Sequence, residues 1–160
     1  MSTKQIQKIT RFGGARSNLM YFPETASQTF KEGQPVYITT AGRITACAAG
    51  AQAFLGIAAM DAQGTVDLKT AVDVIKPGDW FVGNVYHATA ASAVCADASV
   101  GLKYGFTVTS NIGVVNIADV STVGVKIVAR MPEDSATDVY ARVVFAFIST
   151  YVQSDLCAQV

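Results

Sequence analysis

Short runs of apolar and β-branched residues, separated by turn signals, follow one another from about residue 33 onward. Val36 to Thr40 is such a run, and a second begins at Arg43. Between them, Gly42 is suited to the left-handed conformation that closes a three-residue loop, so the pattern predicts a β-hairpin. A third run, Phe54 to Ala59, completes a predicted three-stranded meander, about the smallest β unit that is stable in water.

The same pattern continues to the end of the chain. Further predicted strands cover residues 66–68, 72–75, 80–86, 104–108, 112–117, 123–130 and 140–152. Asn111 suits the turn between two of these strands, and Gly83 indicates a bulge or the close approach of another backbone. The last strand is apolar on both faces, so we expect it to be covered on both sides. About nine or ten short strands predict one all-β domain, a barrel or a sandwich.

Residues 88–98 are dominated by alanine and give two alternatives. Their composition allows a short helix, but the apolar positions form no stripe with a period of 3.6 residues. We therefore favour an irregular or strand-like bridge over a helix.

The first 31 residues show little periodicity and are predicted to form an extended arm ahead of an all-β domain at 32–160. Four basic residues precede the first acidic one, Glu24, and they alternate with apolar residues. Such an arm is either a solvated tail or a segment that becomes ordered against a partner surface. Its charges suit an acidic protein surface at least as well as phosphate, so nucleic acid is not an expected partner.

Composition adds an indication of surface contact. Only 15% of the 160 residues are charged and 51% are hydrophobic, which suggests either a large core or apolar area covered by a partner. The longest apolar run, Val143 to Ile148, is too short to cross a bilayer, and the N-terminus has no apolar signal region. We expect a protein made in the cytoplasm, with no membrane partner.

Residues that could carry chemistry are few. His87 is the only histidine, the three cysteines have no metal-binding spacing, and no nucleophile, phosphate-binding or dinucleotide-binding motif occurs. The acidic loop with Glu133, Asp134 and Asp138 lacks the regular ligand alternation of a calcium loop. The sequence predicts no catalytic residues, no metal site, no cofactor and no enzymatic activity.

One stretch resembles a known family. The order EGQPVYI, a glycine turn, RITACAAGAQ and then AFLGIAAMDAQG resembles the opening repeat of tailed-bacteriophage head decoration (capsid cement) proteins. The resemblance implies a structural virion protein that binds the major capsid protein on the outer surface of the assembled capsid and stabilises it. Members of that family often form homotrimers, so a homo-oligomer, and a trimer first, is the expected state.

In that hypothesis the arm supplies capsid contacts, with apolar side chains as anchors and basic ones for orientation. The candidate capsid-binding residues are Lys4, Lys8, Arg11, Phe12, Arg16, Leu19, Tyr21 and Phe22. An alternative is a barrel that binds a small apolar molecule in a cavity lined by Trp80, Phe81, Tyr86, Phe145 and Phe147. A phage tail or fibre component is a further alternative.

Overall fold

The computed structural model describes the backbone of residues 7–9 and the whole of residues 18–154. The fold is all-β with two sheets that pack together, as predicted, and residues 18–154 contain only 3₁₀ helices besides the strands. In the six-stranded sheet the strands are β1 (Gln7–Ile9), β7 (Trp80–Tyr86), β8 (Lys103–Thr109), β9 (Ile112–Asn116), β10 (Val123–Arg130) and β11 (Arg142–Phe147). In the five-stranded sheet they are β2 (Leu19–Pro23), β3 (Pro35–Ile38), β4 (Ile44–Ala46), β5 (Gly56–Ala58) and β6 (Lys69–Val74). No helix in the described ranges has the length and apolar character needed to span a bilayer.

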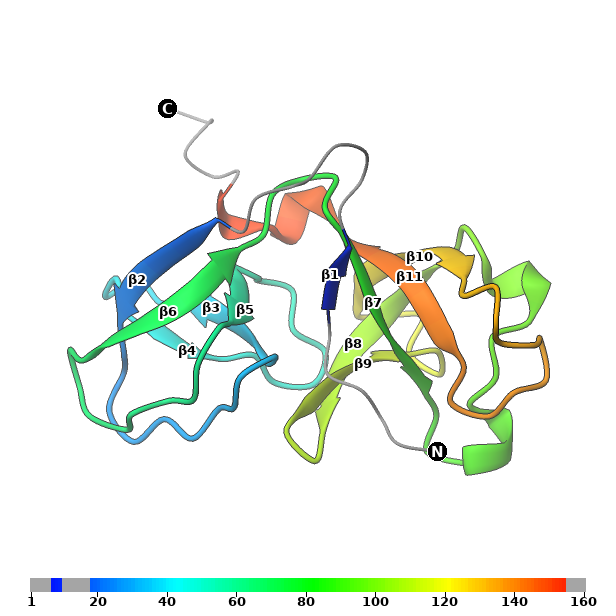
Figure 1. Cartoon of the computed structure of the whole chain (residues 1–160), viewed down its shortest axis with the longest axis horizontal. Helices are drawn as coiled ribbons and strands as arrows, with labels where there is room; N and C mark the ends of the chain where they lie inside the picture. Colours follow the sequence, from blue (N-terminus) through cyan, green and yellow to red (C-terminus); the bar gives the residue numbers. More distant parts are fainter. Residues whose placement is uncertain (1–6, 10–17, 155–160) are drawn as a thin grey trace.

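The six-stranded sheet closes on itself. Its order is β1-β7-β11-β10-β8-β9, and the end of β7 also pairs in parallel with β9 through Val85 and Val115. Five strands therefore form a closed barrel, at the right in Figure 1, while β1 pairs with the other end of β7. The predicted hairpin of β8 and β9 turns through Ser110 and Asn111, both of which have positive φ.

The five-stranded sheet has the order β2-β6-β5-β3-β4 and lies at the left in Figure 1. The predicted hairpin of β3 and β4 is present, and Gly42 has φ +74°. The predicted meander is wrong, however, because β5 pairs with β3 rather than with β4. Residues 47–55 cross to the far side of β3, so β3 becomes the central strand of the three.

Side chains and backbone from residues 24–28 cover the edge of β4. Glu24 forms a parallel bridge with Ile44, and the Thr25 N–H donates to the Ile44 carbonyl at 3.0 Å. The Gln28 Oε1 then accepts hydrogen bonds from the Thr45 hydroxyl and the Ala46 N–H. This edge thus has partners even though no strand lies beside it.

Two apolar clusters hold the sheets. The larger is the barrel core, where Phe54, Phe81, Phe106, Phe145 and Phe147 pack ring against ring. The smaller lies within the five-stranded sheet around Phe30, Val36, Ile44 and Val72. Ile57 and Ile75 belong to the five-stranded half yet are buried in the barrel cluster, so the two halves share one interface.

The last described segment joins the two halves. It includes η3 (Ser149–Tyr151), a 3₁₀ helix that follows β11 of the barrel. Gln153 then pairs with Ile38 of the other sheet, because its side chain both accepts from the Ile38 N–H and donates to the Ile38 carbonyl. The amide side chain takes the place of a strand beside β3.

Several local expectations have different outcomes. Residues 88–98 are irregular, as favoured, and contain η1 (Ala90–Ser92) and η2 (Asp97–Ser99). The register of β7 and β11 runs through Gly83 without a shift, so the predicted bulge is absent from this pairing. In β11 only one face is fully buried, since Val144 and Ala146 are half-buried on the outside of the barrel. The expectation of two fully covered faces was wrong, because the outer face of β11 is only partly buried among the described residues.

The stretch expected to be an arm is in part a strand. β2 pairs with β6 over its whole length, Glu24 is fully buried, and Phe30 is 2% exposed. Residues 19–31 therefore belong to the five-stranded sheet and its core, where the predicted boundary at residue 31 has no structural counterpart. The sequence of β2 shows no alternation of apolar and polar residues, because apolar side chains occupy both faces of the strand.

Candidate binding surface

The structure separates the arm residues that were expected to act together. Lys8 lies in β1, where its backbone pairs with Phe81 of the barrel. Leu19, Tyr21 and Phe22 lie in β2 of the other sheet. Leu19 and Tyr21 are exposed, whereas Phe22 packs against the smaller core. The remaining candidates, Lys4, Arg11, Phe12 and Arg16, lie outside the described residues.

The outer edge of β2 presents backbone groups. The Val74 N–H donates to the Asn18 carbonyl, and the Glu24 N–H donates to the Leu68 carbonyl, at 3.1 and 2.9 Å. Since hydrogen-bonding direction alternates along an antiparallel strand, the even-numbered residues of β2 face β6. The odd-numbered residues, Leu19, Tyr21 and Pro23, must direct their backbone groups away from the sheet. Within residues 18–154 the peptide groups of Leu19 and Tyr21 find no partner on that side.

Exposed apolar side chains gather at this edge. The exposed fractions are 48% for Leu19, 54% for Met20 and 61% for Tyr21, and Val66 and Leu68 are also exposed in the loop that leads into β6. A groove of about 440 Å³ continues the surface, lined by Asn18, Leu19, Met20, Val74, Lys76, Pro77 and Ser154. We call β2 together with this groove the β2 edge surface.

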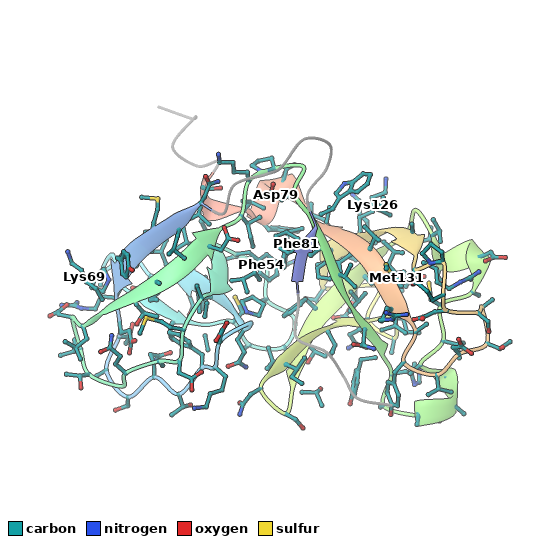
Figure 2. The ribbon with its side chains drawn as sticks, in the orientation of Figure 1. Phe54, Lys69, Asp79, Phe81, Lys126 and Met131 are labelled. Carbon is teal, nitrogen blue, oxygen red and sulfur yellow. The ribbon has the colours of Figure 1, made fainter. Side chains whose placement is uncertain are left out.

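A second surface feature lies on the outside of the barrel. Lys126 of β10 stands directly opposite Lys103 of β8, and both side chains are exposed. Like charges in opposite cross-strand positions are destabilising, so this pair has an energetic cost that a negative partner would remove. Figure 2 shows Lys126 on the barrel half and Lys69 on the five-stranded half.

The lysine pair differs from four of the other described cations, whereas the exposed Lys69 and Lys76 likewise form no salt bridge within residues 18–154. Arg43, Arg130, Arg142 and Lys31 all form salt bridges with carboxylates of the chain. The hydrogen bond and charge of Arg43 lower the pKa of Asp67, and those of Asp134 raise the pKa of Arg142. Lys103 and Lys126 have no ion-pair partner in the part of the chain that the structure describes, so their charge is available to a ligand.

The residues weighed as reactive groups serve local structure. His87 Nδ1 accepts a hydrogen bond from the Thr89 N–H. In the acidic loop, Asp134 binds Arg142 and Asp138 accepts from the Ser135 N–H, so both carboxylates organise the loop. Burial raises the pKa of the Cys47 thiol, which lowers its reactivity. Within the described residues no group of three or more potential metal ligands occurs.

The aromatic residues weighed as a ligand cavity do not share one surface. Phe81, Phe145 and Phe147 face inward and contact one another, with ring centroids 5.2 to 5.9 Å apart. Trp80 and Tyr86 are only half-buried, because alternation along β7 turns them to the outside. Phe54 and Phe106 fill the space between the inward rings, and Figure 2 shows Phe54 and Phe81 near the centre of the molecule.

Comparisons with protein-family models, with curated proteins and with solved structures found no match. The surface features described above are therefore assessed on their own chemistry.

Neither the lysine pair nor Met20, which is exposed on the β2 edge surface, was predicted from the sequence as a contact residue. Lys103 and Lys126 are separated by 22 residues, and only the pairing register of β8 and β10 brings them opposite each other. No local pattern carries that information. For Met20 a signal was present, because it lies between two of the residues that were selected in an apolar run.

Proposed function

We propose that this chain is a structural protein of a tailed-phage head, which binds the outer surface of the assembled capsid and stabilises it. The main support for the proposal is the exposed pair of Lys103 and Lys126, which form no salt bridge within the described residues. Two adjacent cations on the barrel suit contact with an acidic protein surface. The resemblance of residues 32–64 to head decoration proteins supplies the identity of that surface.

One glycine of the resembling segment has a structural role in this sheet. Its glycine at position 56 lies against β6, where a Cβ atom would come within 2.4 Å of Val72 Cγ1 and 2.5 Å of the Asp73 carbonyl oxygen. The segment therefore needs glycine for tight packing between β5 and β6. That requirement accounts for the glycine of the F-x-G-I-A pattern.

The packed interior favours surface contact over the alternative of a small-molecule carrier. In the barrel, Phe54 and Phe147 have ring centroids 4.6 Å apart, and both side chains are almost fully buried. A carrier would need that space for its ligand. A tail or fibre protein stays an alternative, because it would use the same kind of surface.

The first test is the composition of purified phage particles from the source of this sequence. We expect the chain to be present in heads, at a copy number comparable with that of the major capsid protein, and to be released without loss of the shell. Its presence in tails alone would favour the tail alternative. Its absence from particles would contradict the proposal.

A second test uses heads stripped of the chain and the purified protein added back. The double substitution Lys103→Glu and Lys126→Glu should weaken binding by about tenfold or more and remove much of its salt dependence. Lys69→Glu is the control, since Lys69 is also exposed and lies on the five-stranded half of the molecule. Equal loss for both variants would mean that net charge, rather than this pair, governs binding. The expected homotrimer is checked on the same sample by sedimentation equilibrium.

A further inference from the structure

We propose that the β2 edge surface binds the β2 edge surface of a second copy of this chain, as an antiparallel strand pair with a two-fold axis at Met20. Within the described chain the edge of β4 is covered by Thr25 and Gln28, whereas the outward peptide groups of β2 have no partner. An edge that exposes both peptide groups and apolar side chains is a template for another strand.

The hydrogen-bonding groups of this edge complement themselves. With the axis at Met20, Leu19 of one copy lies opposite Tyr21 of the other, and each such pair exchanges two hydrogen bonds. All outward N–H groups of β2 are then used, because the third outward residue, Pro23, has none. The alternative register, centred on Tyr21, would place Pro23 opposite Leu19 and leave the Leu19 carbonyl without a donor.

The side chains favour the same partner. β2 carries no charged residue, so two copies of the edge meet without repulsion along the strand. Leu19 of one copy and Tyr21 of the other form an apolar cross-strand pair, a type of pair that stabilises sheets. The groove that begins at Leu19 has room for the Tyr21 ring of the second copy. Both exposed apolar side chains are thereby removed from water.

This contact does not depend on the proposed capsid function. A pair formed by identical edges is two-fold by symmetry, so it is distinct from any three-fold contact within a trimer and would join one oligomer to the next. It is tested on the purified protein alone.

Cysteine cross-linking tests the register. Met20 would face its copy in a non-hydrogen-bonded pair, with Cα atoms about 4.5 Å apart, within the range that a disulfide bridges. In a Cys157→Ser background, Met20→Cys should give a covalent dimer under mild oxidation. Val120→Cys, at an exposed residue in a distant loop, should stay a monomer on a non-reducing gel. No dimer from Met20→Cys, or a stronger one from Tyr21→Cys, would overturn the proposed pairing.

Sedimentation equilibrium tests the interface without oxidation. Tyr21→Lys should raise the dissociation constant of the two-fold contact by about tenfold or more, since it places a charge against an apolar surface. Val120→Lys, which adds the same charge at a residue that is 70% exposed, should leave it unchanged. Circular dichroism confirms that both variants stay folded. The proposal would be contradicted if the wild-type protein showed no two-fold association. It would also be contradicted if the wild type and both variants had the same dissociation constant.

Discussion

The two halves of this molecule differ in how the edges of their sheets are paired or covered. The barrel closes through the parallel pairing of β7 with β9 and surrounds five phenylalanine rings. The five-stranded sheet has a smaller core and covers the edge of β4 with residues 24–28, but within the described residues nothing pairs with the outer edge of β2. A closed barrel has no free edge, whereas the outermost strand of an open sheet can pair with a further strand. The proposed contact between two copies uses this difference.

Phe147→Ala should have the largest effect, because Phe147 is the centre of the barrel core. Its ring centroid lies 4.6 Å from that of Phe54 and 5.2 Å from that of Phe81. We expect the free energy of unfolding to fall by about 4 kcal/mol. Phe22→Ala, at the rim of the smaller core, should cost only about 1 to 2 kcal/mol. Urea denaturation measures both, and equal losses would contradict the assignment of the main core to the barrel.

Gly56→Ala should destabilise the five-stranded sheet by about 3 kcal/mol, since the added methyl group overlaps Val72 and the backbone of Asp73. Gly42→Ala is the matched control. That glycine has open space around it but a positive φ, so the loss should be only about 1 kcal/mol. Thermal unfolding of the two variants distinguishes overlap from backbone strain. A smaller effect at Gly56 than at Gly42 would mean that β5 and β6 can move apart.

Glu24→Gln should cost about 2 kcal/mol and act on the five-stranded half. The buried Glu24 carboxylate accepts hydrogen bonds from the N–H groups of Gln63 and Gly64 and from the Thr70 hydroxyl. An amide has one acceptor oxygen fewer and would direct N–H groups toward these donors. Hydrogen exchange should show faster opening of the 62–70 segment, with the barrel strands unchanged. Glu133→Gln, an exposed control, should leave both regions as they are.

Asp119→Asn should have the smallest effect, about 1 kcal/mol at neutral pH. Hydrogen bonds from the Thr122 hydroxyl and N–H, and then from Ser121, lower the pKa of Asp119 to about 2, from an ordinary value of 3.8. The folded state thus favours the ionised carboxylate, and its contribution is complete above about pH 4 and lost as the pH falls toward 2. The stability difference between wild type and variant should disappear over that window. A constant difference from pH 5 to pH 2 would argue against this role.

Much of the fold followed from local pattern. The hairpins turning at Gly42 and at Ser110-Asn111 were predicted because few residues accept a positive φ. The alternation at Val66 to Leu68 misled, since Asp67 has φ +65° and sits in a turn. The Asp67 N–H donates to the Glu24 carbonyl, and the Glu24 N–H donates to the Leu68 carbonyl. Short alternating runs occur in turns as well as in strands, and here the contacts with Glu24, which is distant in sequence, accompany a turn.

Less of the candidate surface than of the fold could be predicted from the sequence. Leu19 and Tyr21 were selected as contact residues, and both are exposed. Their place at a sheet edge could not be predicted, because the pairing of β2 with β6 joins residues about 50 positions apart in the chain. The exposed lysine pair depended on the same kind of long-range register.

The sequence alone determined that this chain forms short strands, where its tight turns fall and how apolar it is, because these depend on neighbouring residues. The tertiary structure decided which strands pair, that β5 crosses to the far side of β3, and that the barrel closes while β2 lies at the edge of its sheet. Those choices depend on pairing between distant segments, where burial of the whole apolar set outweighs any local preference.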